Sequence, residues 1–321
     1  MTAAPGQSRP SDSTAPQLLA HDSDPARPRI SGAAWAALAV VYVVWGSTYL
    51  AIRITVETVP PFLSASARFV VAALLLALLL AWRQGPAVLR VNAPQLGSAA
   101  LVGVMLLLGG NGLVVLAEQS GVPSGLAALL VAAVPLWVVL LRRATGGHTS
   151  GATVAGVLVG LLGLVVLTVP GLSGEVGLSG LLMVIGATLS WSSGSFLASR
   201  LPLPGNPFTA SVYEMLAGGL ACLPVAAAKG ELHRLDLSAV STGSWLALGY
   251  LVVFGSLVAF SAYAWLLQSA PLPLVATYAY VNPVVAVFLG WLILSEPLSL
   301  PIVLGGAIVV GGVFLVVRSE R

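Results

Sequence analysis

The stretch VVAALLLALLL, residues 70–80, contains eleven consecutive apolar side chains. A second stretch, VLGGAIVVGGVFLVV, covers residues 303–317 and also has no charged or strongly polar side chain. An α-helix needs about 20 predominantly apolar residues to cross the ~30 Å hydrocarbon core of a bilayer. Blocks of this kind, extended by their flanks, therefore predict membrane-spanning helices. Closed β-barrels also span membranes, but they consist of short alternating segments, which this sequence lacks.

The composition supports a membrane protein. Apolar residues make up 58% of the 321 residues and charged residues only 8%, about a third of the charged share of a typical soluble domain. The net charge of +3 is small and scattered, so no nucleic-acid partner is expected. Cys222 is the single cysteine, which excludes a disulfide framework. The three histidines lie outside the apolar blocks, and neither a metal site nor any other cofactor is expected.

The breaks between apolar blocks predict an all-α integral membrane protein with ten transmembrane helices. The expected spans are residues 33–52, 61–82, 95–116, 122–141, 151–169, 177–199, 207–228, 244–267, 271–294 and 300–317. Residues 1–30 are rich in Pro, Ser, Asp and Arg and poor in apolar side chains, so we expect a disordered cytoplasmic tail.

The distribution of basic residues predicts the orientation, because loops on the cytoplasmic side carry an excess of Lys and Arg. An even number of spans places both termini on one side of the membrane. If that side is the cytoplasm, only Arg53, Lys229 and Arg234 lie outside, and Arg68 lies within a span. The basic residues on the cytoplasmic side are then Arg9, Arg27, Arg29, Arg83, Arg90, Arg142, Arg143, Arg200, Arg318 and Arg321. We therefore expect a multi-pass protein of the cell (inner) membrane with both termini cytoplasmic.

The second half of the sequence repeats features of the first in the same order, at offsets of 146 to 149 residues. The matching pairs are Tyr49–Arg53 with Phe196–Arg200, Pro61-Phe62 with Pro207-Phe208, Gln119-Ser120 with Gln268-Ser269, and Gly156 and Gly163 with Gly305 and Gly312. This series predicts two repeats, residues 31–170 and 177–318. Because each repeat has five spans, the second must enter the membrane from the opposite side. Inverted repeats of this kind underlie many secondary transporters, with the substrate site near the midplane between the halves.

Several motifs resemble the EamA branch of the drug/metabolite transporter superfamily. They are Tyr42–Tyr49, Ala67–Phe69, Tyr280–Val284 and Ser295–Pro297, and Glu118-Gln119 with Val122–Gly125 is similar to the YedA-like members. The resemblance implies two tandem EamA units, alternating access, and export of small metabolites, amino acids or drug-like compounds. Many members have an acidic residue after span four, matching Glu296 after span nine. This chain has Arg142-Arg143 and Gly146-Gly147 there instead, which puts the role of that acid in doubt.

Two ionisable residues lie within predicted spans, Arg68 and Glu214, each seven residues after the proline that opens its span. Buried charges are costly in a membrane, so a gating or coupling role is expected of both. Alternatively, Arg68 reaches outward to Glu57 or Glu118, and Glu214 reaches Arg200. A direct pair is a third reading. It is hindered by the inverted topology, which places the two residues at depths that differ by roughly 10 Å.

Polar and aromatic side chains inside the spans form the predicted substrate pathway, since a lipid-facing hydroxyl or amide would lose hydrogen bonds. They are Trp45, Ser47, Thr48, Asn111, Trp137, Trp191, Ser193, Ser195, Tyr263, Tyr278, Tyr280 and Asn282. Helix packing is the alternative for each of them. No acidic or basic cluster lies among them, so a strongly charged polyanion or polycation is not an expected substrate.

The expected partners are a small-molecule substrate and the lipid bilayer. Gly156 and Gly160 permit close helix approach, either within the fold or in a homodimer. An enzyme is not expected, because the spans contain no His, no Asp and no nucleophile–base pattern. A non-transporting membrane sensor or scaffold is the alternative function, and a channel is a further one. No ATP-binding motif is present, so transport would be driven by a gradient.

Overall fold

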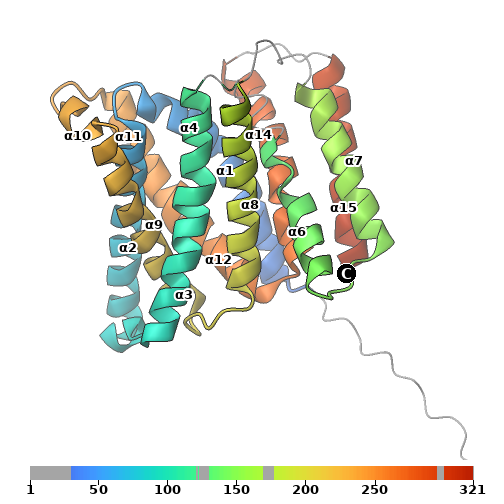
Figure 1. Cartoon of the computed structure of the whole chain (residues 1–321), viewed down its shortest axis with the longest axis horizontal. Coiled ribbons are helices and arrows are strands. Elements are labelled where there is room, and N and C mark those ends of the chain that lie inside the picture. Colours follow the sequence, from blue (N-terminus) through green and yellow to red (C-terminus); the bar gives the residue numbers. More distant parts are fainter. Residues whose placement is uncertain (1–29, 121, 123–129, 169–176, 295–299, 321) are drawn as a thin grey trace, which may run out of the picture.

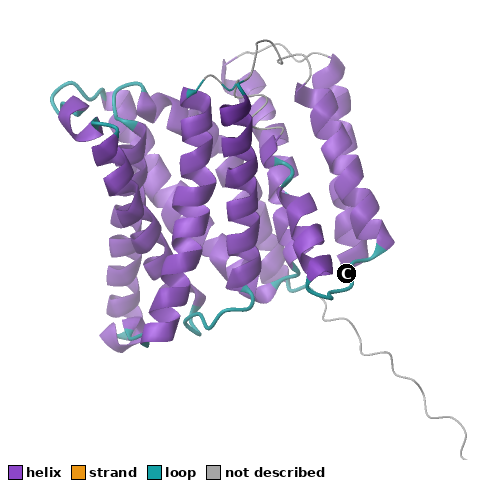
Figure 2. Cartoon of the chain, viewed as in Figure 1, coloured by secondary structure: helices purple, strands orange, loops and turns teal. Residues whose placement is uncertain are grey.

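The computed structural model describes residues 30–120, 122, 130–168, 177–294 and 300–320. All regular structure in these ranges is helical (Figure 2), which confirms the all-α prediction for the part of the chain that is described. The predicted tail, residues 1–30, lies almost entirely outside these ranges, as do Glu296 and Pro123–Gly125.

Seven helices are long and uninterrupted: α1 Gly32–Val56, α2 Pro61–Gln84, α7 Gly151–Thr168, α8 Leu178–Ala198, α9 Pro207–Ala228, α14 Tyr278–Leu294 and α15 Leu300–Glu320. Two longer rods each contain a π-helical segment: α3 Ala93–Gly103, Val104–Gly112 and α4 Leu113–Gln119, and then α11 Thr242–Tyr250, Leu251–Val258 and α12 Ala259–Ser269. The short elements are a 3₁₀ turn Pro86–Leu89, α6 Val134–Ala144, α10 Glu231–Arg234 and α13 Leu272–Ala276.

Six of the described helices are long and apolar enough to cross a membrane. They are Gly32–Val56, Pro61–Gln84, Ala93–Ala117, Leu178–Ala198, Pro207–Ala228 and Thr242–Ser269. Shorter apolar helices lie in three other predicted ranges, at Gly151–Gly163, Leu272–Val285 and Val303–Ser319. The fourth range, 122–141, contains most of α6 together with residues outside the description. The count of ten spans therefore stays a prediction.

The helices begin where the sequence supplies caps. Ser31 accepts a hydrogen bond from the Ala34 amide (3.1 Å), and Ser241 accepts one from the Ser244 amide (3.1 Å). Asn92 and Gln95 form a reciprocal capping box at the start of α3. Such side chains satisfy amides that have no partner within the helix. α2 is different, because it begins after Pro60 and has no cap of its own.

Both π-helical segments lie in the third helix of their half, Val104–Gly112 in the first and Leu251–Val258 in the second. Their starts are 147 residues apart, within the offsets of the sequence repeat. Segments of π-helix are rare and frequently occur at functional sites. Both halves therefore contain the same local distortion at the corresponding place in the helix order.

Helices from the two halves pack side by side across the molecule (Figure 1). α2 packs on α9 at one edge and α7 on α15 at the other, while α1 lies in the middle against α12 and α14. Arg200, at the end of α8, donates a hydrogen bond to Thr145 beyond the end of α6 (3.4 Å), and Asn206 donates one to Gln84 at the end of α2 (3.3 Å). Helix ends that carry arginines on the predicted cytoplasmic side therefore meet at one end of the bundle.

Glycines hold α7 and α15 close together. A Cβ added at Gly163 would lie 2.6 Å from the Val309 amide nitrogen, and one added at Gly156 would lie 2.8 Å from the Gly312 carbonyl oxygen. Backbone atoms cannot yield as a flexible side chain can. The glycines of spans five and ten therefore pack against each other within the fold, which was the first of the two alternatives for them.

Replacing Gly312 by alanine is expected to lower the free energy of unfolding by about 1–3 kcal/mol, because the new Cβ would meet the backbone of Gly160. The matched control is Gly311→Ala, since a Cβ at Gly311 meets nothing within 4 Å. Thermal unfolding of the two purified variants, monitored by size-exclusion chromatography, measures the stability of each. A Gly312→Ala protein as stable as Gly311→Ala would contradict the tight α7–α15 contact.

Candidate functional site

Four aromatic side chains from four helices meet in the middle of the bundle. They are Trp45 of α1, Trp191 of α8, Tyr263 of α12 and Tyr278 of α14, called here the aromatic cluster. Their ring centroids are 5.0–6.4 Å apart in all six pairs, mostly tilted or edge-on. These are the separations at which aromatic pairs attract one another beyond the effect of burial. The structure thus brings together four of the residues predicted to line the pathway.

Hydrogen bonds hold the cluster in place. The Trp191 indole donates to the Tyr263 hydroxyl (3.1 Å), which also shares a hydrogen bond with Ser195 Oγ (2.6 Å). The Trp45 indole donates to the Gly255 carbonyl (3.1 Å). Each of these polar atoms is therefore satisfied although Tyr263 is only 1% exposed and Trp45 only 9%.

The two tryptophans make reciprocal contacts between the halves. Trp45, in the first half, bonds to Gly255 in the π-helical segment of the second half. Trp191, in the second half, packs on Gly110 in the π-helical segment of the first, where an added Cβ would lie 2.5 Å from the indole. The cluster therefore lies where the two halves of the chain contact each other.

Three further predicted pathway residues on α1 and α14 make hydrogen bonds of their own. Ser47 donates to the Val44 carbonyl (2.7 Å) and contacts the Tyr250 hydroxyl, and Thr48 donates to the Trp45 carbonyl (2.7 Å). With its amide turned to satisfy its neighbours, Asn282 donates to the carbonyls of Tyr42 (3.3 Å) and Tyr278 (3.2 Å). Asn282 thus ties α14 to α1, and one of its partners is the backbone of the cluster residue Tyr278.

Four other predicted pathway residues lie elsewhere. Tyr280 donates to the Val157 carbonyl (3.0 Å) and packs on Gly160, so it belongs to the contact of α14 with α7. Trp137 donates to Thr188 (3.1 Å) and joins α6 to α8. Asn111 is exposed, and Ser193 is half-buried on α8. The structure does not gather these four with the cluster, and a role for them in the pathway stays a prediction.

Arg68 and Glu214 form no ion pair with each other in the described part of the chain. The Arg68 guanidinium lies over the Phe69 ring, 4.3 Å from its centroid, and its buried Nε has no hydrogen-bond partner. Glu214 is 1% exposed and its Oε2 also lacks a partner. Among the described side chains, Arg68 makes no ion pair with Glu57, and Glu214 makes none with Arg200, whose guanidinium lies over the Phe196 ring at 3.5 Å. The side chain of Glu118, the other predicted partner of Arg68, lies outside the description.

Glu231 lies between the predicted spans 207–228 and 244–267 and is not among the predicted site residues. Its carboxylate is fully buried, and Oε2 accepts hydrogen bonds from the amides of Phe62 (2.9 Å) and Leu63 (3.0 Å). A carboxylate from the second half therefore caps α2 of the first, where the helix dipole favours negative charge. The signal in the sequence was indirect: a helix that begins Pro60-Pro61 has no cap residue, so its first amides need an acceptor from elsewhere.

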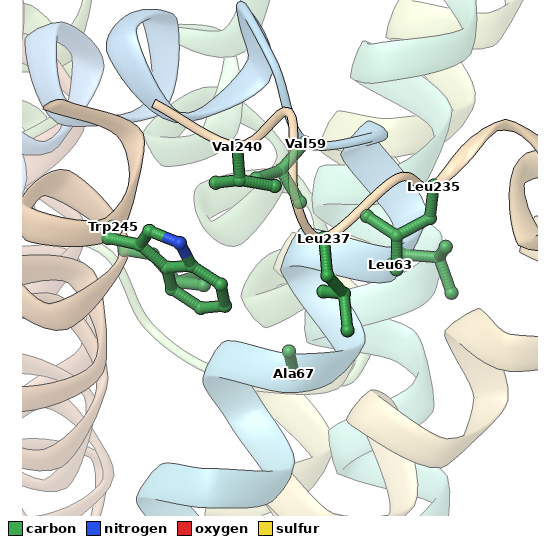
Figure 3. Close-up of a pocket in the computed structure, with 8 residues that line it drawn as sticks. Val59, Leu63, Ala67, Leu235, Leu237, Val240 and Trp245 are labelled. Carbon is green, nitrogen blue, oxygen red and sulfur yellow. The ribbon is translucent and has the colours of Figure 1, made fainter. Parts of the chain in front are cut away.

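Two cavities lie away from the cluster. A small apolar one of about 100 Å³ forms where the segment after α10 folds over the start of α2; Figure 3 shows Leu235, Leu237 and Val240 facing Val59 and Leu63. A larger one, about 320 Å³, lies near the ends of α8 and α12, the bundle end that holds Arg200. Its lining is Ala198, Ser199, Leu201, Leu203, Pro204, Gly205, Leu267 and Gln268.

Comparison with known proteins identifies relatives over nearly the whole chain. The model of the EamA-like transporter family matches twice, over residues 30–169 and 178–318. An uncharacterized inner membrane transporter of Escherichia coli (strain K12), YedA, is 41% identical over 265 residues, which cover 82% of this chain and 83% of that protein. A probable amino-acid metabolite efflux pump of the same strain is 25% identical over 293 residues, covering 88% and 94%.

A solved crystal structure shares the fold. It aligns with a TM-score of 0.75 and 23% sequence identity, covering 90% of this chain and 97% of that one. At this identity the likeness bears on the fold alone.

Proposed function

Because the chain belongs to the EamA-like transporter family, we propose that it is a secondary transporter that exports small metabolites, amino acids or drug-like compounds. The relatives named as an inner membrane transporter and as an efflux pump support this direction and location. The proposed molecule has ten transmembrane helices in two inverted five-helix repeats, residues 31–170 and 177–318. Both termini are on the cytoplasmic side.

One observation carries the proposal, namely the aromatic cluster on the interface between the halves. Trp45 comes from the first half and the other three rings from the second, and each tryptophan contacts the π-helical segment of the opposite half. If the halves exchange their packing, these contacts must separate. A solute on the midplane would then meet the rings first from one side and then from the other.

The larger cavity supports a route by which a solute enters from the cytoplasmic side. It lies beside the ends of α8 and α12, the two helices that carry Trp191, Ser195 and Tyr263. In the proposed cycle a cytoplasmic solute enters near this cavity and reaches the cluster along these helices. Arg68 and Glu214 are proposed as gating or coupling residues, because each has a buried side-chain atom without a hydrogen-bond partner.

The test is transport by the purified protein in liposomes, with labelled amino acids and drugs supplied with and without a proton gradient. We expect uptake above that of protein-free liposomes for at least one neutral or singly charged solute. A gradient that changes the rate would identify the coupling ion. Failure of every small solute to move would favour a membrane sensor or scaffold.

A further inference from the structure

The connection between α9 and α11, residues 229–241, carries two acidic side chains, and both accept hydrogen bonds within the protein. Glu231 accepts from the amides of Phe62 and Leu63 at the start of α2, where the helix dipole offsets its charge. Asp236 accepts from the amide (2.9 Å) and the hydroxyl (2.6 Å) of Ser238 in its own turn. The two carboxylates are therefore partnered without the basic residues of the connection.

The basic residues of the same connection have no acidic partner. Arg234 is exposed and Lys229 is half-buried, and neither forms an ion pair with a described side chain. One Arg234 nitrogen donates to the Lys229 carbonyl (2.7 Å), which brings the guanidinium back to the end of α9. A guanidinium has five N–H donors and an ammonium has three, so most of them remain available to another acceptor. Two cations at the end of α9 therefore lack a counter-ion in the described part of the chain.

Large apolar side chains are exposed beside these cations. Leu232 and Leu237 of the connection and Leu246 of α11 are more than half exposed, and Trp245 is nearly so. Exposed Trp and Leu next to basic residues are typical of a segment at the membrane–water interface. Both α9 and the rod that begins with α11 are long and apolar enough to cross a membrane. Their connection, at the corner of the bundle where Figure 1 shows α10, therefore lies at the level of the lipid headgroups.

The apolar cavity beneath the connection leads to an exposed face of α2. Leu63 and Ala67 line this cavity of about 100 Å³ (Figure 3), and Ala67 is exposed. Val71, Leu74 and Leu78 are exposed on the same face, at helical spacings from Ala67. From Ala67 to Leu78 this face extends about 16 Å along the helix axis. The cavity and this face, called here the α2 groove, form an apolar surface that runs from the headgroup level into the span.

The chemistry of the occupant follows from these two parts. The α2 groove lies in the part of α2 that crosses the membrane, so an acyl chain is the group that can fill it. The phosphate of the same lipid lies at the level of Lys229 and Arg234, to which it is complementary in charge. A zwitterionic headgroup adds a cation of its own beside these two residues, whereas an anionic headgroup does not. Apolar contact and charge together therefore favour an anionic phospholipid.

We propose that the α9–α11 connection and the α2 groove form a binding site for a phospholipid with an anionic headgroup. The lipid phosphate accepts hydrogen bonds from Arg234 and Lys229, and one acyl chain lies in the cavity and along the exposed face of α2. The site is separate from the aromatic cluster and does not depend on what the protein transports. A lipid bound there holds the connection over the start of α2, so it stabilises the folded protein.

The first experiment compares lipids by thermal unfolding of the purified full-length protein in detergent. Dioleoyl phosphatidylglycerol, dioleoyl phosphatidylcholine and inorganic phosphate are added separately. At one hundred times its dissociation constant, phosphatidylglycerol is expected to raise the unfolding midpoint by about 4 °C. We expect phosphatidylcholine to give less than half of this shift and inorganic phosphate to give none. Equal shifts with the two lipids, or an equal shift with inorganic phosphate, would overturn the proposal.

The second experiment tests the headgroup contact. The double variant Lys229→Gln/Arg234→Gln is expected to lose the difference between phosphatidylglycerol and phosphatidylcholine, because it removes the charge that selects between them. Arg83→Gln/Arg90→Gln is the matched control, since these two arginines are also exposed but lie at the opposite end of α2 and just beyond it. The control should keep the wild-type difference. An unchanged difference in the first variant, or an equal loss in the control, would refute the assignment of the headgroup.

The third experiment tests the acyl chain. Ala67→Phe places a ring at the exposed end of the cavity, so the variant should fold as wild type does but gain less than half of the wild-type shift from phosphatidylglycerol. Leu79→Phe is the control, because Leu79 is exposed on α2 outside the α2 groove. A full shift with Ala67→Phe would contradict the place of the chain. All three experiments measure unfolding and not transport, so a protein that moves no solute would refute the proposed function and leave the lipid site standing.

Discussion

Trp45→Ala is expected to reduce transport to the level of protein-free liposomes and to lower the free energy of unfolding by about 3–5 kcal/mol. Trp45 contacts the other three rings of the aromatic cluster, with centroids 5.0 Å from Tyr263 and Tyr278 and 5.7 Å from Trp191. It also provides the bond to Gly255 of the opposite half. Removing the indole therefore opens a cavity at the centre of the cluster and deletes a contact between the halves at once.

Trp45→Phe separates the two effects. Phenylalanine keeps an aromatic ring in the cluster but cannot donate to the Gly255 carbonyl, so it should cost only about 0.5–1.5 kcal/mol in stability. If transport depends on the link between the halves, Trp45→Phe will fold well and still transport slowly. Trp82→Phe is the control, because Trp82 is 79% exposed and lies outside the cluster. Wild-type transport by Trp45→Ala would contradict the placement of the pathway at this interface.

The sequence predicted Trp45 and Trp191 as pathway residues for a reason that the geometry explains. Trp45 lies well inside its apolar block, where an interfacial anchor is not expected. The same reason applied to Trp137, which joins α6 to α8 and not the cluster. Trp45 and Trp191 lie 146 residues apart, which is an offset of the sequence repeat. The structure brings these two rings into contact, with their centroids 5.7 Å apart.

The sequence does not predict which of Tyr278 and Tyr280 faces the cluster. Both are aromatic with a hydroxyl and lie two residues apart, yet Tyr278 faces the cluster and Tyr280 faces α7. Two residues on a helix differ by about 200° around its axis. α14 is apolar on almost every side, so its pattern defines no single buried face. Only the neighbouring helices decide which tyrosine points to the centre.

The π-helical segments were not predicted for a related reason. Val104–Gly112 and Leu251–Val258 have the apolar composition of ordinary spans. Trp191 packs on Gly110 and Thr48 packs on Gly255, so both segments are contacted by residues more than 80 positions away in the sequence. Helix position and apolar character followed from local sequence, whereas these long-range contacts did not.

Glu231→Ala is expected to lower the free energy of unfolding by about 2–4 kcal/mol, because it leaves the amides of Phe62 and Leu63 without an acceptor in a buried place. The second carboxylate oxygen, Oε1, has no partner, so removal of the charge itself relieves part of this cost. Thermal unfolding of the purified protein measures the change.

Glu231→Gln tests whether charge or hydrogen bonding provides the stability. The amide oxygen can still accept from Phe62 and Leu63, but the attraction of a full negative charge to the start of α2 is lost. We therefore expect Glu231→Gln to lie between wild type and Glu231→Ala. If the stability of Glu231→Gln is close to that of wild type, accepting the two hydrogen bonds is sufficient. If it is close to that of Glu231→Ala, the negative charge provides most of the stabilisation.

A second set of hydrogen bonds also attaches the second half of the chain to the connection before α2. These bonds determine what is expected if Glu231 does not stabilise the protein. Thr58 donates to Ser244 (2.8 Å) and accepts from the Ser241 amide (3.2 Å), so the start of α11 also holds the end of the α1–α2 connection. If both Glu231 variants unfold like wild type, these hydroxyl bonds carry the attachment of the second half to α2. In that case Thr58→Val, which removes them, should be the destabilising substitution instead.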